Sequence, residues 1–467
     1  MSARRTTTRR TPATGPRPRR PVRDDARNTA YDVIRAVDER DAYANLLMPR
    51  LLRERGLTGR DAALATELAY GTLRGLGTYD AVIEVCTDRA PDPDVRDALR
   101  LGTHQLLRMR VPPHAAVGTT VDLVRARIGQ GPAKFVNAVL RKIAARTADE
   151  WIAVVAQDDP VGRLSVAHSH PRWIVGAFRD ALGGDDAETS ALLEADNARP
   201  LVTLVARPGR SSVGELAESG AAPGRYSPYA AYLPEGDPGQ VRAVADYRAA
   251  VQDEGSQLVA LALARVPLEG PDGRWLDMCA GPGGKAGLLD AIAAYGDPAE
   301  GFPGGVHLLA AELQYHRARL VWQTTREAVV VTADSTEPPW RPGVFDRVML
   351  DAPCTGLGAL RRRPEARWRR DPASLPELTR LQRRLLAAAL DAVRPGGVVA
   401  YVTCSPHLAE TGLVVDDVLR EHADVERLDA RAYLPEVADL GDGPDVQLWP
   451  HRHGTDAMFL ALLRRRR

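Results

Sequence analysis

The sequence predicts a multi-domain protein with an all-α N-terminal domain, a small α+β linking module and a C-terminal α/β domain built on a doubly wound, mostly parallel sheet. Three observations lead to this prediction. The chain has 467 residues, which is too long for one ordinary domain. Its first third shows only helical periodicity. From about residue 248 onward, short apolar runs alternate with helical segments, as in α/β folds.

Composition excludes several classes of protein. Apolar residues make up 44% of the chain and charged residues 26%, which is typical of a globular domain with real cores. No stretch approaches the roughly 18 apolar residues of a membrane span, and no apolar segment follows the N-terminal arginines as in a secretory signal. The chain has four cysteines and no CxxC spacing, so neither a disulfide framework nor a metal site is expected. We expect a cytoplasmic protein with reduced thiols and no membrane contact.

The net charge of +1 conceals three basic segments. Residues 1–23 carry eight arginines and no acid, residues 361–370 carry six arginines and one glutamate, and the chain ends in four arginines. Local basic segments favour a polyanion such as RNA as partner, because phosphate contacts are made locally, although ordinary solvated surface is the alternative. Lysine occurs only at Lys134, Lys142 and Lys285. A lysine in such a chain indicates a place that needs a compact ammonium rather than a planar guanidinium.

The N-terminal domain is predicted over residues 24–160, after a disordered basic tail at 1–23 that has almost no apolar residue. Helical spacing of apolar residues supports it, beginning with Ala30, Val33, Ile34 and Val37. The pattern continues over residues 62–73 and 117–128. Prolines 91, 93, 112, 113 and 132 are expected to lie between the helices rather than inside them.

The linking module is predicted over residues 161–247. It shows two helical segments, at 173–182 and 187–195, followed by an apolar run at 201–205 that is typical of a strand. The mixture indicates a small α+β module.

The C-terminal domain is predicted over residues 248–467. Five short apolar runs have the character of buried strands: 274–278, 306–310, 328–331, 344–350 and 398–402. Helical segments at 286–294 and 378–393 lie between some of them. In sheets of this kind, ligands bind beyond the carboxyl ends of the strands, where Gly- and Asp-containing turns follow each run.

A glycine-rich turn follows the first of these strands. Residues 279–285 read Cys-Ala-Gly-Pro-Gly-Gly-Lys and lead into a helix, so a ligand can approach the backbone closely. The phosphate-binding loop motif is excluded because Ala286 occupies its Ser/Thr position. Glu312 and Asp334 end the next two strands. Either acid alone could be a helix N-cap, but an acid after the second strand suits a ribose, and the series indicates a nucleoside-bearing cofactor.

Two of the four cysteines follow the last two predicted strands. Asp351-Ala352-Pro353-Cys354 comes after the strand at 344–350, and Thr403-Cys404-Ser405 comes after the strand at 398–402. Both thiols are therefore expected at the ligand-binding edge of the sheet, where cysteines are typical of chemistry rather than of packing.

These motifs together resemble those of the S-adenosylmethionine-dependent RNA 5-methylcytosine methyltransferases. The resemblance extends to Gln-Asp-Glu-Gly-Ser-Gln at 252–257 and to residues 451–459, which are similar to the last strand pair of that family. Residues 68–74 and 135–141 resemble the NusB-like domain that heads the small-subunit ribosomal RNA methyltransferase B (Fmu/Sun) branch. One departure is Glu312, which stands where aspartate is commoner.

The resemblance implies a role for each motif. Cys404 would attack C6 of a cytosine, and Cys354 would assist release of the product. Asp351 would hold the base, and Lys285 would favour the thiolate or orient the base. The residues implied to hold S-adenosylmethionine are Cys279, Ala280, Gly281, Pro282, Gly283, Gly284, Lys285, Glu312, Asp334 and Asp351.

The resemblance also implies a substrate, a cytidine in small-subunit (16S) ribosomal RNA. The same chemistry on transfer RNA or another RNA is one alternative, and a non-catalytic RNA-binding factor in ribosome assembly is another. The presence of Cys354, Cys404 and Lys285 argues against the non-catalytic alternative. DNA is not expected as substrate, because DNA cytosine methyltransferases use a Pro-Cys cysteine and would not need Thr403-Cys404-Ser405.

Overall fold

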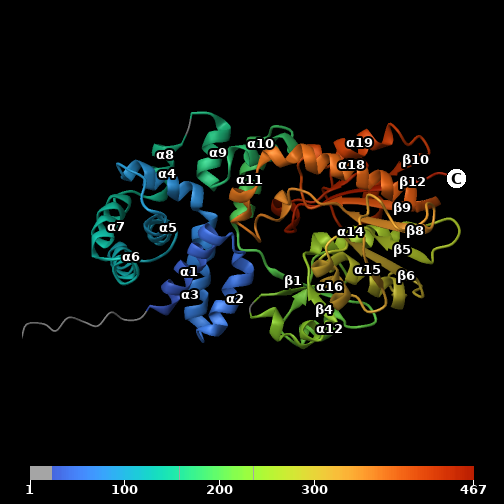
Figure 1. Cartoon of the computed structure of the whole chain (residues 1–467), viewed down its shortest axis with the longest axis horizontal. Coiled ribbons are helices and arrows are strands. Elements are labelled where there is room, and N and C mark those ends of the chain that lie inside the picture. The colour runs from blue at the N-terminus through green and yellow to red at the C-terminus, as the bar shows by residue number, and fades with distance from the viewer. Residues whose placement is uncertain (1–23, 157, 235) are drawn as a thin grey trace, which may run out of the picture. The chain divides into compact units, whose positions relative to one another are not determined.

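The computed structural model describes residues 24–156, 158–234 and 236–467, and it contains the predicted helical domain, α+β module and α/β domain (Figure 1). The predicted basic tail at 1–23 lies outside the described residues. The chain divides into two compact units. One holds the helical residues up to Thr72 together with Val82–Ala148, and the other holds Leu73–Ala81 together with Asp149–Arg467.

The described part of the first unit is helical, as predicted, and Ala30, Val33, Ile34 and Val37 are all buried. The helices are α1 (Asp25–Arg40), α2 (Ala44–Glu54), α3 (Gly59–Arg74), α4 (Leu76–Cys86), α5 (Pro93–Leu107), α6 (Pro113–Arg127) and α7 (Gln130–Ile143), with the end of α3 and the start of α4 belonging to the second unit. The expectation that prolines avoid the helices is wrong for Pro93 and Pro113, which are the first residues of α5 and α6, and for Pro132, which lies in the first turn of α7. A proline is tolerated there because its missing N–H would have no partner within the helix.

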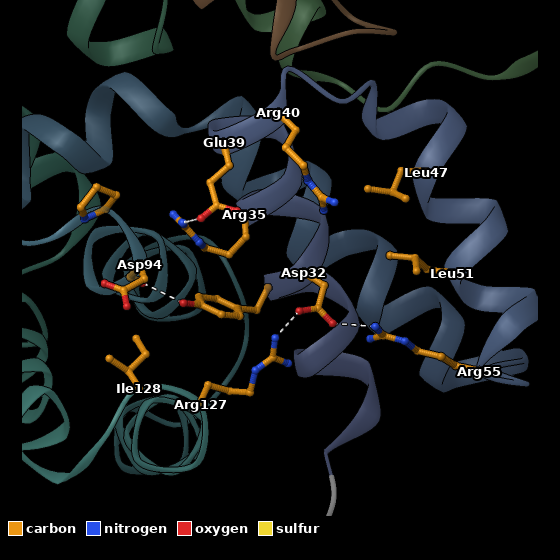
Figure 2. Close-up of a pocket in the computed structure, with 12 residues that line it drawn as sticks. Asp32, Arg35, Glu39, Arg40, Leu47, Leu51, Arg55, Asp94, Arg127 and Ile128 are labelled. Atoms are coloured by element: carbon orange, nitrogen blue, oxygen red, sulfur yellow. Dashed lines mark hydrogen bonds and ion pairs between the residues drawn. The ribbon is translucent and has the colours of Figure 1, made fainter.

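A polar cleft of about 690 Å³ lies in this helical domain (Figure 2). Its lining includes Asp32, which accepts hydrogen bonds from Arg55 Nη2 at 2.6 Å and from Arg127 Nη2 at 2.5 Å. Arg35 likewise pairs with Glu39. Because carboxylates within the cleft neutralise much of its positive charge, it offers no concentrated cationic surface. The candidate chemistry lies in the second unit.

The linking module contains helices followed by a small antiparallel sheet. Helix α8 (Ala148–Val155) precedes the predicted module, and α9 (Pro160–His168) begins at its boundary. The later helices are α10 (Arg172–Ala181), α11 (Asp186–Asn197), α12 (Val213–Ala217) and α13 (Arg242–Ala245). The strands are β1 (Val202–Ala206), β2 (Ala222–Pro223), β3 (Ala230–Leu233) and β4 (Ala249–Val251), arranged in the order β2-β3-β1-β4. Ile174 and Phe178 of α10 pack into one core with Leu357 and Leu360, which follow Cys354 in the sequence. The module therefore supports a segment next to one of the candidate catalytic thiols.

The α/β domain is built on one mixed sheet in the order β10-β12-β9-β8-β5-β6-β7, with β11 paired to β12. The strands are β5 (Arg274–Asp277), β6 (His307–Glu312), β7 (Val329–Thr332), β8 (Phe345–Asp351), β9 (Val393–Thr403), β10 (Val425–Leu428), β11 (Val446–Gln447) and β12 (Phe459–Arg465). The strands β5 to β9 pair in parallel, and β12 is antiparallel to both β9 and β10. The chain leaves β5 for β6 on one side and returns to β8 on the other, and this reversal creates a ligand-binding crevice at the end of β5.

One sequence-based expectation about the end of the chain is wrong. Residues 451–459 do not form a strand pair: they contain most of the short helix α20 (Pro450–His453) and a turn at Gly454, and β12 begins only at Phe459. Gly454 has φ +72°, a left-handed conformation that ends the helix and favours glycine.

Helices cover both faces of the sheet. They include α14 (Glu254–Arg265), α15 (Gly284–Tyr295), α16 (Tyr315–Thr324), α18 (Leu375–Ala392) and α19 (Gly412–Leu419). Alternate residues of β9 point to opposite faces: Val398 and Ala400 pack in the core that contains α14 and α15, whereas Val399 and Tyr401 pack with α18 and α19. Burial on both faces explains the continuous apolar runs from which the strands were predicted.

A cluster of four buried or half-buried charges fixes the segment that follows Cys354. Asp253 Oδ2 accepts from Arg361 Nη2 at 2.8 Å and from Arg362 Nη2 at 2.6 Å. Asp456 Oδ1 accepts from Arg361 Nε at 2.7 Å and from Arg362 Nε at 3.0 Å. The cluster ties the start of α14, the segment after Cys354 and the turn before β12 to one another.

This cluster corrects the prediction that residues 361–370 are an RNA-binding surface. Arg361 and Arg367 are buried and Arg362 is half-buried, whereas Arg363 and Arg370 are exposed. Arg367 donates to backbone and side-chain oxygens of the linking module. The arginines that pack inward compensate buried carboxylates and carbonyl groups, so they are not available to phosphates.

We expect Arg361→Met to lower the free energy of unfolding by about 3–5 kcal/mol, because it leaves Asp253 and Asp456 with only Arg362 to compensate two buried charges. The measurement is urea denaturation of the full chain. Arg363→Met is the matched control, and at this exposed position the loss should stay within about 0.5 kcal/mol. Equal losses in the two variants would contradict a structural role for the cluster.

Candidate active site

Four of the predicted site residues meet where β5, β8 and β9 end. Lys285 Nζ donates to Asp351 Oδ2 at 2.8 Å, and the Sγ atoms of Cys354 and Cys404 are 3.5 Å apart. The register explains this meeting, because β8 and β9 are parallel neighbours in which Asp351 is paired with Val402. Loops that leave paired parallel strands emerge at the same edge of the sheet. Lys285 and Asp351 both act electrostatically on the Cys404 sulfur.

The two thiols are not equivalent. The hydrogen bond between the sulfurs and the burial of Cys354 raise the pKa of Cys354 well above its ordinary value. The same hydrogen bond lowers the pKa of Cys404, although burial and Asp351 oppose that shift and Lys285 assists it. The two shifts therefore favour the thiolate form at Cys404 and the thiol form at Cys354. Because the thiolate is the nucleophilic form of cysteine, the geometry favours Cys404 as the nucleophile.

Lys285 supplies a fixed positive charge beside this thiolate. Burial works against the charged ammonium, but the Asp351 carboxylate outweighs burial and raises the pKa of Lys285. The ammonium thus stays charged in a nearly buried position, where its effect on a neighbouring sulfur is stronger than in water.

A buried polar network behind Cys354 was missed by the sequence analysis. The fully buried Glu410 accepts from Thr355 N at 2.8 Å and from Gln382 Nε2 at 3.1 Å. Thr355 Oγ1 also lies 3.1 Å from Ser405 Oγ, so the network joins the loops that carry the two cysteines. Glu410 could have been selected from the sequence because it lies shortly after Cys404. Gln382 lies in the middle of α18, and nothing in its sequence context indicates a role at the site.

Backbone contact brings the two cysteine loops together as well. Gly358 N donates to Cys404 O at 2.9 Å, and Ala457 N donates to Gly358 O at 2.9 Å. A Cβ at Gly358 would lie 2.0 Å from Ala457 O, so only glycine allows this close approach. The distance between the two sulfurs is therefore set by backbone as well as by side chains.

The glycine-rich loop brings its backbone against the acid at the end of β6. Gly281 N donates to Glu312 Oε2 at 3.1 Å, and a Cβ at Gly281 would lie 2.1 Å from the same oxygen. Gly283 has φ +111°, and a Cβ there would lie 2.0 Å from Thr324 Oγ1. Both positions require glycine, and the loop thereby stays within reach of the Glu312 carboxylate.

The other loop residues differ in their roles. Ala280 is buried in a small core with Ala286, Gly284 begins α15, and Pro282 is exposed. Burial raises the pKa of the Cys279 thiol well above its ordinary value, so this cysteine stays protonated and is not a second nucleophile.

Beneath this loop lies a buried carboxylate that the sequence analysis did not select. Asp277 is fully buried; its Oδ1 accepts from Cys279 N at 3.3 Å, and its Oδ2 has no hydrogen-bond partner among the described residues. Burial, reinforced by the Asp351 charge, raises the pKa of Asp277 to about 7. An unpartnered buried acceptor suits a ligand that brings its own positive charge or donor.

Two further features flank the Glu312 site. Leu313 is 62% exposed, so it offers an apolar surface next to Glu312. Asp334 is exposed and accepts from Thr336 N at 2.8 Å, without a direct bond to the other predicted residues. Its neighbour Ser335 donates to Met278 O at 2.7 Å, which holds the Asp334 loop beside the end of β5.

The described ranges contain neither a membrane-spanning helix nor a metal-binding cluster of side chains. None of the helices there combines the length and the apolar character that a bilayer span requires. Within the same ranges, no group of three or more His, Cys, Asp or Glu side chains could hold a metal ion.

Similarity to known proteins extends over nearly the whole chain. Residues 265–464 match the family model described as 16S rRNA methyltransferase RsmB/F, and residues 24–145 match the NusB family. Ribosomal RNA small subunit methyltransferase B of Pseudomonas putida is 32% identical over 94% of this chain and 98% of its own length. The chain belongs to this methyltransferase B family. A relative in Mycobacterium tuberculosis that carries the name of a methyltransferase is 55% identical over 97% of the chain and 98% of its own length.

The predicted family, fold and cofactor are therefore confirmed. The crystal structure of PH0851 has a TM-score of 0.75 to this chain at 21% identity and covers 95% of this chain and 99% of its own, which shows a shared fold. The protein is a methyltransferase, and its cofactor is S-adenosylmethionine. The residues present fit that group: Glu312 can accept from a ribose, Leu313 offers apolar surface to a purine, and the unpartnered Asp277 oxygen suits a cationic moiety.

We expect alkylation by iodoacetamide to modify Cys404 before Cys354, because the pKa of Cys404 is lowered and that of Cys354 is raised. Cys354→Ala removes the donor that lowers the pKa of Cys404, so the pH midpoint of Cys404 labelling should rise. Mass spectrometry of labelled peptides across a pH series measures both effects. Cys86→Ala, a buried cysteine of the other unit, is the control that should leave the midpoint unchanged. Faster labelling of Cys354 would show that the proton resides on Cys404.

Proposed function

We propose that the protein transfers a methyl group to C5 of a cytidine in small-subunit ribosomal RNA, through a covalent bond between Cys404 and C6 of the base. The observation that carries the proposal is the pair of sulfurs 3.5 Å apart, in which the pKa of one thiol is raised and that of the other is lowered. A nucleophile and a separate acid–base group at one place are what this chemistry needs.

The first step is attack of the Cys404 thiolate on C6. Position 5 of cytosine is a weak nucleophile, and a new C6–S bond places the electrons of the former double bond at C5. S-adenosylmethionine supplies the electrophilic methyl group that C5 then takes. Lys285 occupies one oxygen of the Asp351 carboxylate. In this proposal the other oxygen accepts from the cytosine amino group, which orients the ring over Cys404.

The second step restores the aromatic ring. C5 now carries a hydrogen as well as the methyl group. A base takes this proton, the electrons of the C5–H bond form the C5–C6 double bond, and the C6–S bond breaks with its electrons returning to the Cys404 sulfur. Cys354 is placed to be the base, because its sulfur lies beside that of Cys404, and it first gives its own proton to solvent once the Cys404 sulfur is bound to C6. Lys285 favours the departing thiolate by its charge.

Ribosomal RNA as substrate is supported by the name of the Pseudomonas putida relative, which is 32% identical over 94% of the chain. In this proposal the helical domain (24–160) and the linking module (161–247) bind RNA, and residues 248–467 perform the transfer in the cytoplasm, where thiols stay reduced.

Two alanine variants distinguish the roles of the cysteines. Cys404→Ala should abolish methyl transfer and leave no covalent protein–RNA species, because C6 is never attacked. Cys354→Ala should still attack and transfer the methyl group but release product slowly, so that a denaturant-resistant adduct accumulates. The assay is a denaturing gel of each variant after incubation with 16S ribosomal RNA and S-adenosylmethionine, and Cys86→Ala, a cysteine of the other unit, is the control that should behave as wild type.

If an adduct forms with Cys404→Ala and not with Cys354→Ala, then Cys354 is the nucleophile and Cys404 assists release of the product. Bisulfite sequencing of the same RNA gives the second readout. If wild-type protein leaves no 5-methylcytosine in the 16S transcript, the substrate assignment is wrong.

A further inference from the structure

Helix α16 presents an exposed face of aromatic and basic side chains next to the cofactor site. Tyr315, Arg319 and Trp322 lie at positions i, i+4 and i+7 of the helix, so they share one face. Tyr315 and Trp322 are both 70% exposed. The adjacent face of the helix packs inward through Ala318 and Val321. The fold therefore directs two large aromatic rings into solvent, where hydration of apolar surface is unfavourable.

Within residues 24–156, 158–234 and 236–467, neither Trp322 nor Arg319 has a partner for its ring or its charge. Among the described residues, the Trp322 ring has no stacking or cation–π partner, and the Arg319 guanidinium has no hydrogen bond or ion pair. By contrast, the neighbouring Arg317 donates to Gly281 O at 2.7 Å, and Arg326 donates to Asp246 O at 3.2 Å. Among the described residues this face therefore lacks partners, although Arg317 and Arg326, before and after it in the sequence, bond to other segments.

The charge of this segment indicates an anionic partner. Residues 313–326 contain three arginines and one histidine and no Asp or Glu, although acidic residues equal basic ones almost one for one over the whole chain (61 against 62). An apolar protein-docking face would carry aliphatic side chains along the same stripe, but here Arg319 lies between the two aromatic rings. Aromatic rings that alternate with arginines are suited to single-stranded nucleic acid, whose bases stack and whose phosphates pair with guanidinium groups.

The position of the helix fits RNA that passes over the methyl donor. The stripe begins at Tyr315, three residues after Glu312. Arg317 lies 3.7 Å from the Glu312 carboxylate and bonds the glycine-rich loop, so the N-terminal turn of α16 is part of the cofactor-site wall. From Tyr315 to Trp322 the helix rises about 10 Å, which corresponds to roughly three nucleotide steps of a stacked strand.

We propose that the face of α16 formed by Tyr315, Arg319 and Trp322 binds a single-stranded segment of the substrate RNA beside the target cytidine. The two rings stack on bases and Arg319 contacts a phosphate. This inference rests on the proposed function, in that the substrate is RNA, and it adds a contact surface on the catalytic domain outside the methyl-transfer site.

The test measures the affinity of full-length protein for a 16S ribosomal RNA transcript over a series of salt concentrations. Trp322→Ala should weaken binding about 5- to 100-fold, the effect of one lost stacked base, without changing the salt slope. Arg319→Gln should instead lower the slope of log K against log salt by about 0.7–0.9. Affinity for S-adenosylmethionine should stay unchanged in both variants, which verifies that the site remains folded.

Two conservative variants separate stacking from plain apolar contact. Trp322→Phe keeps a ring and should bind RNA nearly as well as wild type, whereas Trp322→Leu keeps apolar surface only and should be as weak as Trp322→Ala. Ultraviolet crosslinking gives an independent readout: the RNA should attach to the tryptic peptide of residues 320–326, which contains Trp322.

The outcomes distinguish this inference from the proposed function. Wild-type affinity and salt slope in Trp322→Ala and Arg319→Gln, with RNA still bound, would overturn the inference and leave the proposed function intact. Full recovery of affinity by Trp322→Leu would also overturn it, in favour of apolar docking of a protein or a second copy of this chain. A wild-type protein that binds no RNA would overturn the proposed function itself.

Discussion

The buried ion pairs among Asp253, Arg361, Arg362 and Asp456 hold the catalytic end of the sheet together. The carboxylates come from the start of α14 and the turn before β12, and both arginines come from the segment after Cys354. Burying four charges costs desolvation energy that the pairs only roughly offset. The main effect of the cluster is therefore to fix where the segment after Cys354 lies, rather than to add free energy of folding. It holds the segment that contains Gly358 against the backbone of Cys404, and this backbone contact sets where the second sulfur can lie.

The proposed chemistry depends on the hydrogen bond between the two sulfurs. Neither burial nor the neighbouring carboxylates favour a thiolate, since both raise the pKa of a buried cysteine. The hydrogen bond from Cys354 and the charge of Lys285 oppose that tendency at Cys404, whose pKa is lowered. The carboxylates of Asp277, Glu312 and Asp351 act on the same loops, and negative charge there suits a cofactor that carries positive charge.

The sequence predicted those features that depend on local pattern. Short apolar runs followed by Gly or Asp turns located the five parallel strands, and the edge at which such strands end placed Lys285, Asp351 and both cysteines together. Features that depend on residues far apart in the sequence could not be predicted from it. Arg361 and Asp456 are 95 residues apart, and in the sequence Arg361 is indistinguishable from a surface arginine. The burial of Asp277 is equally invisible, because an acid at a strand end is ordinarily a solvated cap.

The chain's preference for arginine over lysine acquires a physical meaning in this structure. Buried arginines donate hydrogen bonds to several segments of the chain. Arg207 donates from one nitrogen to the carbonyl oxygens of Tyr247 and Thr324. Arg361 donates to two carboxylates and a carbonyl group. A planar fork with five donors is suited to joining several acceptors from different segments. Lys285 differs, because among the described residues its ammonium bonds Asp351 alone and its charge acts on the Cys404 sulfur. A guanidinium there would spread its charge and require further acceptors, so the proposed role of this cation is better met by a lysine than by an arginine.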